Sequence, residues 1–477
     1  MSRLLVSGEG FAPRVIEAEK GANLLEVLRR GGLSLAADCG GRGTCGKCRV
    51  TVDGEQKLAC LVAVAGDMMV ELPRTAAMEV LMHDGDAVVE EGQSGIGVAC
   101  DIGTTTLAVY AYDLQTGKLL GRAGVPNPQR PFGADVISRI DACVQQADAG
   151  PQMREVLWQA LANAVRGFGI EPGRVARLHL TGNTIMLHIA CGLSVVGLSR
   201  LPFAPEFTNN PPRVMGLAGF EGTLIEVSPC LAGYVGGDAL YGAMECGLQE
   251  TGETRLLMDI GTNGEMLLAH DDRVYACATA AGPAFEGAHI AHGCAAIPGA
   301  IRQVSVVEGG LVCDTVDGAP AVGICGSGLV DAVACLLETG DLSEGGKLSG
   351  EVSLAEGVTL TTADIRQVQL AKAAMRAGVQ VLCKHAGIEE DRIGLILLAG
   401  GFGNVISPAS AQKIGLLPTG ARVVAVGNTA GKGAATALTR PAHSRAAMDE
   451  LLAQTSYIEL STDDDFEDVF VDNLVFE

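Results

Sequence analysis

Two stretches of this 477-residue chain share one pattern: "VACDIGTTTLAVYAYD" at residues 98–113 and "LLMDIGTNGEMLLAHD" at residues 256–271. In each, an apolar run leads into Asp-Ile-Gly-Thr, a short polar turn follows, and a second apolar run leaves. This order predicts a β-hairpin whose tip carries a carboxylate, a glycine and hydroxyl groups. One such tip could be an ordinary tight turn, but two copies with matching strands indicate a duplicated functional unit.

The hairpin tip has the chemistry of a phosphate-binding loop. Backbone N–H groups and threonine hydroxyls donate hydrogen bonds to phosphate oxygens, and glycine lacks the Cβ that would block their approach. The aspartate can hold magnesium through water or polarise the attacking water. The duplicated hairpin resembles the two phosphate motifs of the actin, hexokinase and Hsp70 ATPase superfamily, whose two ribonuclease-H-like lobes close on a nucleotide.

Further segments fit this resemblance. "RIGLILLAGGFGNVI" (392–406) is a buried strand that runs into Gly400 and Gly401 and then a helix, like the superfamily's adenosine motif. Read alone, it is equally well a plain strand-to-helix turn. Gly-Asn-Thr twice ends a predicted strand and starts a helix, at 182–184 and 427–429, which fits one such unit in each lobe.

Three acidic residues outside the hairpins are candidates for a role where the lobes meet. Asp238 in "GYVGGDAL" and Asp331 in "GICGSGLVDAV" open predicted helices, where the helix dipole alone also favours a carboxylate. Glu286 in "AGPAFEG" could orient water near the second lobe, and a solvated or capping glutamate is the alternative.

A different motif lies upstream, where "DCGGRGTCGKCR" (38–49) contains three cysteines among four glycines. A predicted hairpin that turns at Asp53-Gly54 then brings a fourth cysteine back beside the third. The glycines let the backbone fold around inorganic sulfides and aim N–H groups at them. One loop with three ligands and a distant fourth is the arrangement of plant-type 2Fe-2S ferredoxins. Zinc, which usually takes two paired cysteine motifs, is the alternative. The spacing is Cys39-x5-Cys45-x2-Cys48-x11-Cys60.

Composition restricts the partners. The formal net charge of -22 makes non-specific binding to nucleic acid or anionic lipid unfavourable, and no uncharged stretch is long enough to span a membrane. Most of the 15 cysteines are scattered singly through apolar segments, as expected of reduced thiols in the cytoplasm. The acidic segment "STDDDFEDVF" near the C-terminus predicts a solvated terminus.

The predicted fold class is a multidomain α/β and α+β protein. A β-grasp, 2Fe-2S ferredoxin-like domain occupies residues 1–73, and a linker occupies 74–96. A two-lobed, ribonuclease-H-like (actin-like ATPase) domain follows at 97–477, with lobes at about 97–253 and 254–477.

Together the motifs resemble one family, the reductive activators of corrinoid-dependent methyltransferases. Besides the segments above, the resemblance rests on "NPQRPFGADVISRI" and "TGNTIMLH", and it covers nearly the whole chain. It implies ATP-dependent one-electron reduction of an inactivated cob(II)alamin protein to cob(I)alamin, with a 2Fe-2S cluster, ATP and Mg²⁺ as cofactors. The implied partners are a corrinoid protein and a low-potential electron donor. A homodimer is one option for the oligomeric state, which the resemblance does not fix. Larger family members have an additional domain between ferredoxin and ATPase parts, where this chain has only the linker.

The resemblance also implies roles for individual residues. The implied cluster ligands are Cys39, Cys45, Cys48 and Cys60. The implied catalytic acids are Asp101, Asp259 and Glu286. The implied nucleotide-binding residues are Gly103, Thr104, Thr105, Gly261, Thr262, Asn263, Gly400 and Gly401.

Two other functions fit parts of the chain. An ATP-dependent activator of a radical enzyme, such as a 2-hydroxyacyl-CoA dehydratase, resembles the same ATPase lobes, but it holds a 4Fe-4S cluster between subunits and lacks the N-terminal cysteine loop. A non-catalytic iron-sulfur redox sensor could use the ATPase-like lobes only as a binding module.

Overall fold

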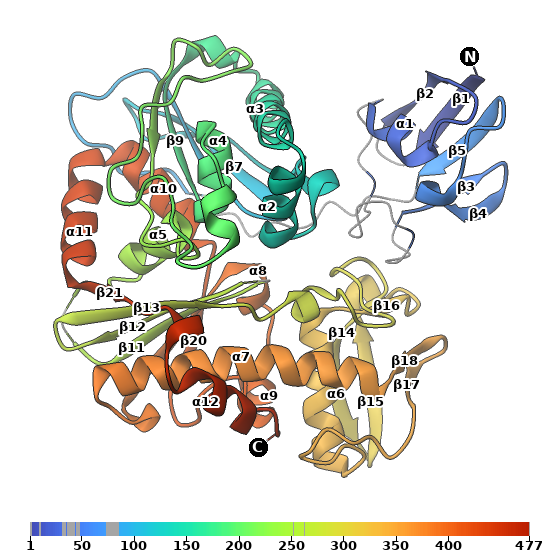
Figure 1. Cartoon of the computed structure of the whole chain (residues 1–477), viewed down its shortest axis with the longest axis vertical. Coiled ribbons are helices and arrows are strands. Elements are labelled where there is room, and N and C mark those ends of the chain that lie inside the picture. The colour runs from blue at the N-terminus through green and yellow to red at the C-terminus, as the bar shows by residue number, and fades with distance from the viewer. Residues whose placement is uncertain are drawn as a thin grey trace.

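The computed structural model of the protein describes residues 2–8, 11–30, 35, 43, 48–72, 85–250, 252–261 and 263–476. Figure 1 shows a small N-terminal sheet joined to a larger part in which two sheets lie one above the other. Within the described residues, no helix is both long enough and apolar enough to cross a lipid bilayer.

The N-terminal unit is a five-stranded mixed sheet in the order β2-β1-β5-β3-β4. Helix α1 (Leu24–Arg30) packs on one face, where it buries Leu24, Leu25 and Leu28 against Leu4 and other strand residues. The turn at Asp53-Gly54 has positive φ at both residues, 51° and 86°, so the predicted hairpin is confirmed. The strands are β1 (Ser2–Gly8), β2 (Phe11–Ala18), β3 (Arg49–Val52), β4 (Glu55–Leu58) and β5 (Met68–Leu72).

The first large sheet has the order β10-β9-β6-β7-β8. Its strands are β6 (Ile96–Ile102), β7 (Thr106–Asp113), β8 (Leu119–Pro126), β9 (Val175–Gly182) and β10 (Leu224–Val227). One face is covered by α2 (Val136–Gln145), α3 (Ala149–Gly167) and α4 (Thr184–Cys191). Along β6, Val98, Cys100 and Ile102 enter the core on this face, whereas Ala99 belongs to a core on the other face. Burial on both faces explains why the strand has a continuous apolar run.

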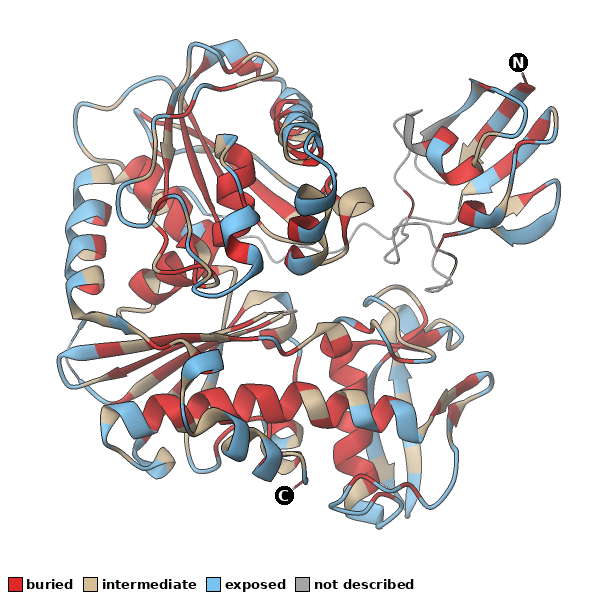
Figure 2. Cartoon of the chain, viewed as in Figure 1, coloured by how far each residue is buried: buried red, intermediate tan, exposed pale blue. Residues whose placement is uncertain are grey.

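The second large sheet repeats this plan in the order β20-β19-β11-β12-β13-β21. Its strands are β11 (Arg255–Ile260), β12 (Gly264–His270), β13 (Arg273–Thr279), β19 (Leu395–Ala399), β20 (Arg422–Gly427) and β21 (Thr455–Tyr457). The long helix α7 (Thr362–Ala386) lies along one face, and Figure 2 shows its central turns buried.

The two large sheets have the same topology over five strands. In the first, β10 and β9 are parallel to β6, and β6, β7 and β8 form antiparallel pairs. In the second, β20 and β19 are parallel to β11, and β11, β12 and β13 form antiparallel pairs. Both Asp-Ile-Gly-Thr segments join the first and second strands of their hairpins. The duplication read from the sequence is therefore a duplication of fold.

Two inner helices cross between the lobes. Helix α5 (Gly237–Glu245), which precedes the second sheet in sequence, packs on that sheet together with α11 (Pro441–Gln454). Helix α10 (Thr429–Thr439), near the C-terminus, returns to the first sheet, where Ala434 and Leu438 contact Tyr110 and its neighbours. A lobe boundary near residue 253 therefore does not separate these helices, because α5 precedes it but packs on the second sheet, and α10 follows it but packs on the first.

An additional layer extends the second lobe. It contains β14 (Ala300–Val307), β15 (Gly310–Thr315), β16 (Gly323–Ile324) and α6 (Gly326–Thr339), followed by β17 (Val352–Ala355) and β18 (Val358–Leu360). Two short helices, α8 (Gly400–Gly403) and α9 (Pro408–Lys413), follow β19.

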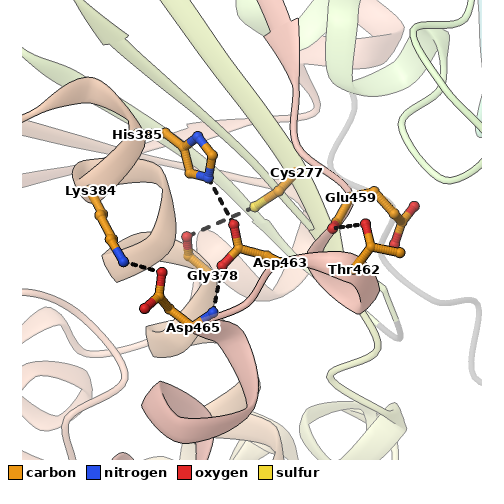
Figure 3. A network of polar contacts seen from close by, with 8 residues as sticks. All are labelled: Cys277, Gly378, Lys384, His385, Glu459, Thr462, Asp463 and Asp465. Atoms are coloured by element: carbon orange, nitrogen blue, oxygen red, sulfur yellow. Dashed lines mark hydrogen bonds and ion pairs between the residues drawn. The ribbon is translucent and has the colours of Figure 1, made fainter.

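The acidic C-terminal segment is folded, and none of residues 461–470 is buried, as expected of the predicted solvated terminus. Helix α12 (Phe466–Asp472) packs on α7, and the segment before it pairs with the end of α7, as Figure 3 shows. His385 Nε2 lies 2.8 Å from Asp463 Oδ2, and Lys384 pairs with Asp465. The acids neutralise basic side chains while Phe476, 2% exposed, enters the core.

Candidate functional site

Two of the four predicted cluster ligands lie within the described residues, and they are adjacent. Cys48 precedes β3 and Cys60 lies in the short helix η1 (Ala59–Leu61), which is held to Cys48 by a 2.8 Å hydrogen bond from the Ala59 N–H to the Cys48 carbonyl. Both thiols are buried, and their Sγ atoms are 3.2 Å apart. This exceeds a disulfide length of about 2.05 Å and approaches the separation of roughly 3.7 Å that two thiolates take on one tetrahedral metal. The pair therefore fits a metal cluster, while Cys39 and Cys45 lie outside the described residues.

The first predicted phosphate loop is a tight turn between β6 and β7. The Gly103 N–H donates to the Thr106 carbonyl at 3.0 Å, and a Cβ on Gly103 would lie only 2.6 Å from that oxygen. Asp101 sits at the end of β6, with Thr104 and Thr105 at the tip. The turn thus needs glycine where the sequence has it.

Three side chains that were not predicted as site residues fix this first loop. Asn127 donates from Nδ2 to the Gly103 carbonyl at 2.8 Å. The buried Arg139 donates to the Thr104 carbonyl at 2.6 Å, and Asn183 donates to the Thr104 hydroxyl at 3.1 Å. These residues belong to "NPQRPFGADVISRI" and to the first Gly-Asn-Thr, so the sequence signal was present as a motif but without a role.

The second predicted phosphate loop is positioned by close packing. Asp259 lies near the end of β11, and the Gly261 N–H donates to the Asn263 carbonyl at 3.2 Å. Gly400 has φ +76°, and a Cβ there would lie 2.4 Å from Asp259 Oδ1. The structure thus brings the predicted adenosine motif against the aspartate of the second loop. Thr262 lies outside the described residues.

The other predicted residues of this region lie close by. No heavy atom lies within 4 Å of a Cβ placed on Gly401, so that position is open. Glu286 is exposed, and its Oε1 would lie 3.9 Å from a Cβ on Gly261. Both residues are therefore placed where a ligand beside the second loop could reach them.

Aromatic packing joins three glycine-rich motifs on this side of the site. The rings of Phe285 and Phe402 stack with centroids 5.3 Å apart. A Cβ on Gly326 would come within 1.9 Å of the Phe285 carbonyl and 2.8 Å of the Phe402 ring. The segments "AGPAFEG", "GICGSG" and "LAGGFG" therefore meet at one point beside the second loop.

The two loops face a shared group of carboxylates. Burial raises the pKa of Asp101 to about 7. A hydrogen bond from Asn428 lowers this pKa, and the Asp259 carboxylate raises it by a smaller amount. Burial and then the Glu286 carboxylate raise the pKa of Asp259 to about 6. The interaction between Asp101 and Asp259 places the two halves of the duplication within electrostatic reach of each other.

Two more acids belong to this group. Asp238, at the start of α5, has a pKa raised to about 8 by burial and then by Asp101. Glu265 lies directly opposite Asp259 in the β11–β12 register, and burial and then Asp238 raise its pKa well above the usual range. Asp238 was a candidate in the sequence and Glu265 was missed, although it follows the second loop immediately. Asp331 instead accepts from Ser410 at 2.6 Å, a contact within the second lobe.

These carboxylates do not form a closed metal cage. Among the described histidines, cysteines and acids, no group of three could hold a metal ion by itself. A magnesium ion that keeps several waters and uses one or two carboxylates plus nucleotide phosphates needs no such cage. The residues present therefore fit a magnesium nucleotide rather than a stand-alone cation site.

The fold and site define a class of protein: a ferredoxin-like, cluster-binding domain joined to a two-lobed actin-like domain with a duplicated Asp-Ile-Gly-Thr hairpin. Family models match the chain in succession, as "2Fe-2S iron-sulfur cluster binding domain" at residues 8–65, "RACo middle region" at 96–251 and "C-terminal domain of RACo the ASKHA domain" at 253–477. The chain belongs to the RACo family.

Similar proteins have related descriptions. The corrinoid activation enzyme RamQ of Eubacterium limosum is 32% identical over 420 residues, which are 80% of this chain and 70% of RamQ. The [Co(II) methylated amine-specific corrinoid protein] reductase of Methanosarcina barkeri is 27% identical over 379 residues, 70% of this chain and 68% of the reductase. A solved "Reductive activator for corrinoid,iron-sulfur protein" is 28% identical with a TM-score of 0.72, covering 100% of this chain and 98% of that one.

Proposed function

We propose that this protein reactivates a corrinoid protein by transferring one electron from its 2Fe-2S cluster to cob(II)alamin, giving cob(I)alamin, in a reaction that depends on ATP. The observation that carries the proposal is the presence, in one chain, of a domain with two adjacent thiols and of two hairpins of the same form, each with an Asp-Ile-Gly-Thr tip. The relatives named as corrinoid activation enzyme and corrinoid protein reductase support it.

The energetics explain why the two parts are joined. A plant-type 2Fe-2S cluster has a reduction potential near roughly -400 mV, which does not populate a much lower-potential acceptor without a further energy source. Binding and turnover of ATP can supply that energy if the nucleotide-bound form holds the corrinoid protein in a state that is easier to reduce. A shift of the lower ligand of cobalt is the change that would raise its potential, and turnover would then release the partner.

The residues of the chain have distinct tasks in this scheme. Cys39, Cys45, Cys48 and Cys60 would hold the cluster, which supplies one-electron transfer when bound. Gly103, Thr104, Thr105, Gly261, Thr262, Asn263, Gly400 and Gly401 would cradle the nucleotide. Within the described part of that set, Gly401 provides the clearest opening, because no heavy atom lies within 4 Å of its Cβ position, whereas a side chain on Gly400 would collide with Asp259.

The acidic residues would orient the attacking water and bind or release protons. Asp101 and Asp259 would orient water bound to magnesium, and Glu286 stands beside the second loop at its exposed side. Burial raises the pKa of Asp238 to about 8, so this carboxyl group can hold a proton at neutral pH and release it when charge changes beside it, and burial raises the pKa of Glu265 in the same direction. A low-potential protein would reduce the cluster between turnovers.

The test is an anaerobic assay with a cob(II)alamin-loaded corrinoid protein and a chemical donor that reduces the cluster. The cob(I)alamin absorbance should grow with MgATP and stay near baseline without nucleotide. Equal rates with and without nucleotide would remove ATP from the reaction. Loss of ATP hydrolysis in Asp101→Ala and Asp259→Ala, together with loss of cob(I)alamin, separates this function from that of a redox sensor.

The identity of the fourth cluster ligand has its own test. Cys60→Ala should lose the 2Fe-2S absorbance and circular dichroism, because the Cys60 Sγ lies 3.2 Å from the Cys48 Sγ and would share the cluster with it. Cys100→Ala, a buried thiol of the first lobe, is the control and should leave the spectrum unchanged. A normal spectrum in Cys60→Ala would assign the ligand to another thiol.

A further inference from the structure

The segment that follows the cluster domain is docked along its described part. Residues 85–95, predicted as part of a linker, have no regular secondary structure yet make hydrogen bonds at both ends. At the first end, the Asp86 carboxylate accepts from the Leu119 N–H at 2.9 Å, and the Ala87 N–H donates to the Gly117 carbonyl at 2.8 Å. A Cβ on Gly117 would lie 1.9 Å from the Ala87 carbonyl, so the contact is tight.

At its other end, this segment joins the two helices that cross between the lobes. The Glu90 N–H donates at 2.9 Å to the carbonyl of Thr439, the last residue of α10. The Glu90 carboxylate accepts from the N–H groups of Ala442 and His443 at 3.0 and 2.8 Å. Since the N-cap residue of α11, Arg440, makes no side-chain cap, Glu90 caps this helix although Ala442 lies 352 positions further along the sequence.

Gln93 adds a second connection. It donates to the same Thr439 carbonyl at 2.5 Å and accepts a hydrogen bond from Arg177 on β9. Arg177 also pairs with Glu226 on β10 at 2.5 Å. One carbonyl at the end of α10, which would otherwise lack a helical partner, is therefore satisfied twice by the segment before β6.

The opposite end of α10 lies at the nucleotide site. Asn428 caps the helix by accepting from the Gly431 N–H at 2.7 Å, and its side chain also hydrogen-bonds to Asp101. Between these ends, Gly431 and Gly433 let the helix approach Tyr110 and Tyr241 closely, because a Cβ on either glycine would lie 3.0 Å from the ring of the corresponding tyrosine, and one on Gly433 also 2.5 Å from the Tyr241 Cβ. An eleven-residue helix of roughly 16 Å thus spans the distance from the first phosphate loop to residues 85–95.

We propose that residues 85–95 form a latch, through which a movement of α10 on nucleotide binding is passed to the segment that carries the cluster domain. The inference rests on the proposed function, because it needs a nucleotide at Asp101. The latch would let a nucleotide bound at Asp101 control where the cluster domain is held, so that electron delivery follows nucleotide binding.

Hydrogen exchange tests the latch without any corrinoid protein. A non-hydrolysable ATP analogue with Mg²⁺ should change the exchange rates of the Glu90, Ala442 and His443 amides at least about fivefold. A response at Gly431 but none at these three amides would overturn the latch. So would the absence of a response at Gly431, since α10 would then not sense the nucleotide.

The matched variants are Glu90→Ala and Glu91→Ala, the second removing the exposed neighbouring carboxylate. Both should keep the cluster spectrum and ATP hydrolysis of the parent. Glu90→Ala should lower ATP-dependent cob(I)alamin formation at least about fivefold relative to Glu91→Ala. Equal rates in the two variants would overturn the latch. If the parent itself forms cob(I)alamin equally well without nucleotide, the proposed function fails, and hydrogen exchange still decides the latch.

Discussion

The two Asp-Ile-Gly-Thr loops have nearly the same sequence and the same place in their sheets, but they are supported in different ways. The first is held by side-chain hydrogen bonds from its own lobe, donated by Asn127, Arg139 and Asn183. The second is shaped by the close approach of Gly400 to Asp259. Duplication has therefore preserved the loop, while the surroundings of each copy have diverged.

This difference separates two kinds of dependence. Hydrogen bonds that satisfy the carbonyls of the first loop make its shape part of the stability of the first lobe. A glycine pressed against a carboxylate contributes little to stability, but it sets the position of the carboxylate. Substitutions around the first loop should therefore lower the free energy of unfolding, and substitutions around the second loop should lower the rate of ATP hydrolysis.

The largest effect is expected for Gly400→Ala. The added Cβ would lie 2.4 Å from Asp259 Oδ1 at a residue with φ +76°, so the carboxylate must move. A displacement of this size should lower the steady-state rate of ATP hydrolysis at least about a hundredfold, with the cluster spectrum unchanged.

Gly387→Ala is the matched control. Gly387 also has positive φ, +70°, but no heavy atom lies within 4 Å of its Cβ position. It should carry the backbone cost of about 1–3 kcal/mol in unfolding free energy and retain hydrolysis. If Gly400→Ala and Gly387→Ala hydrolyse ATP at equal rates, Gly400 does not set the position of the Asp259 carboxylate.

The next effect concerns the first loop. Arg139→Met removes donors to the carbonyls of Thr104 and Gly133 from a fully buried position. Burying those acceptors without partners should lower the unfolding free energy by about 2 kcal/mol. The freed Thr104 carbonyl should also weaken ATP binding about tenfold, equivalent to about 1.4 kcal/mol. Denaturant unfolding and titration calorimetry measure the two changes.

Arg154→Met distinguishes loop support from general stability. Arg154 also donates to two carbonyls of the first lobe, those of Ala190 and Met215, at 3.1 and 3.0 Å, but it does not contact the loop. It should destabilise the lobe and leave ATP affinity unchanged. Equal losses of ATP affinity in both variants would show that the first loop responds to lobe stability alone.

A pH series compares the aspartates themselves. Burial raises the pKa of Asp101 from its usual 3.8 to about 7 and that of Asp259 to about 6. The folded protein binds these protons more tightly than the unfolded chain, so each carboxyl group makes the nucleotide-free protein less stable as pH rises from about 4 toward its folded pKa.

Substitution of either aspartate by the neutral asparagine removes this loss of stability at higher pH. Asp101→Asn should gain stability over the parent, on the order of 1–2 kcal/mol, and the gain should grow until about pH 7. The gain of Asp259→Asn should level off near pH 6. Urea midpoints at pH 5, 6, 7 and 8 measure both curves. Gains that do not change with pH would mean that neither carboxylate is destabilised by burial.

Much of this arrangement could be read from the sequence, because it is local. The repeated hairpins, the turn at Asp53-Gly54 and the strand-to-helix turn at Gly400 and Gly401 each depend on a few adjacent residues. What the sequence did not reveal depends on contacts between distant segments. Arg139 reaches Thr104 across 35 positions, and Glu265 matters because strand pairing sets it opposite Asp259.

The contacts of the C-terminal segment also involve residues that are distant in sequence. Its run of acids suggested a solvated tail, since charge normally stays in water. Residues 461–470 do stay unburied, but the segment is also fixed on α7, because Lys384 and His385 pair with the acids, and Gln369 donates to the Leu474 carbonyl at 2.8 Å. The partners lie some 80 to 105 residues upstream, where no local pattern could associate them with the tail.

The smallest effects are expected for Asn183, which follows β9 in the first lobe, and Asn428, which follows β20 in the second. Both cap a helix, Asn183 by accepting from Met186 and Asn428 by accepting from Gly431, and aspartate caps equally well. In Asn183→Asp, the Thr104 hydroxyl can rotate and donate to the new carboxylate, so unfolding free energy should change by less than about 0.5 kcal/mol.

Asn428→Asp should differ, because the side chain at this position faces Asp101 rather than a hydroxyl. A second carboxylate there removes a donor and adds a like charge, so the pKa of Asp101 should rise further, by up to about one unit. The acidic limb of the pH profile for ATP hydrolysis should move upward in Asn428→Asp and stay in place in Asn183→Asp. If the two profiles shift equally, the first loop is sensitive to any nearby charge, and Asn428 does not act on Asp101 in particular.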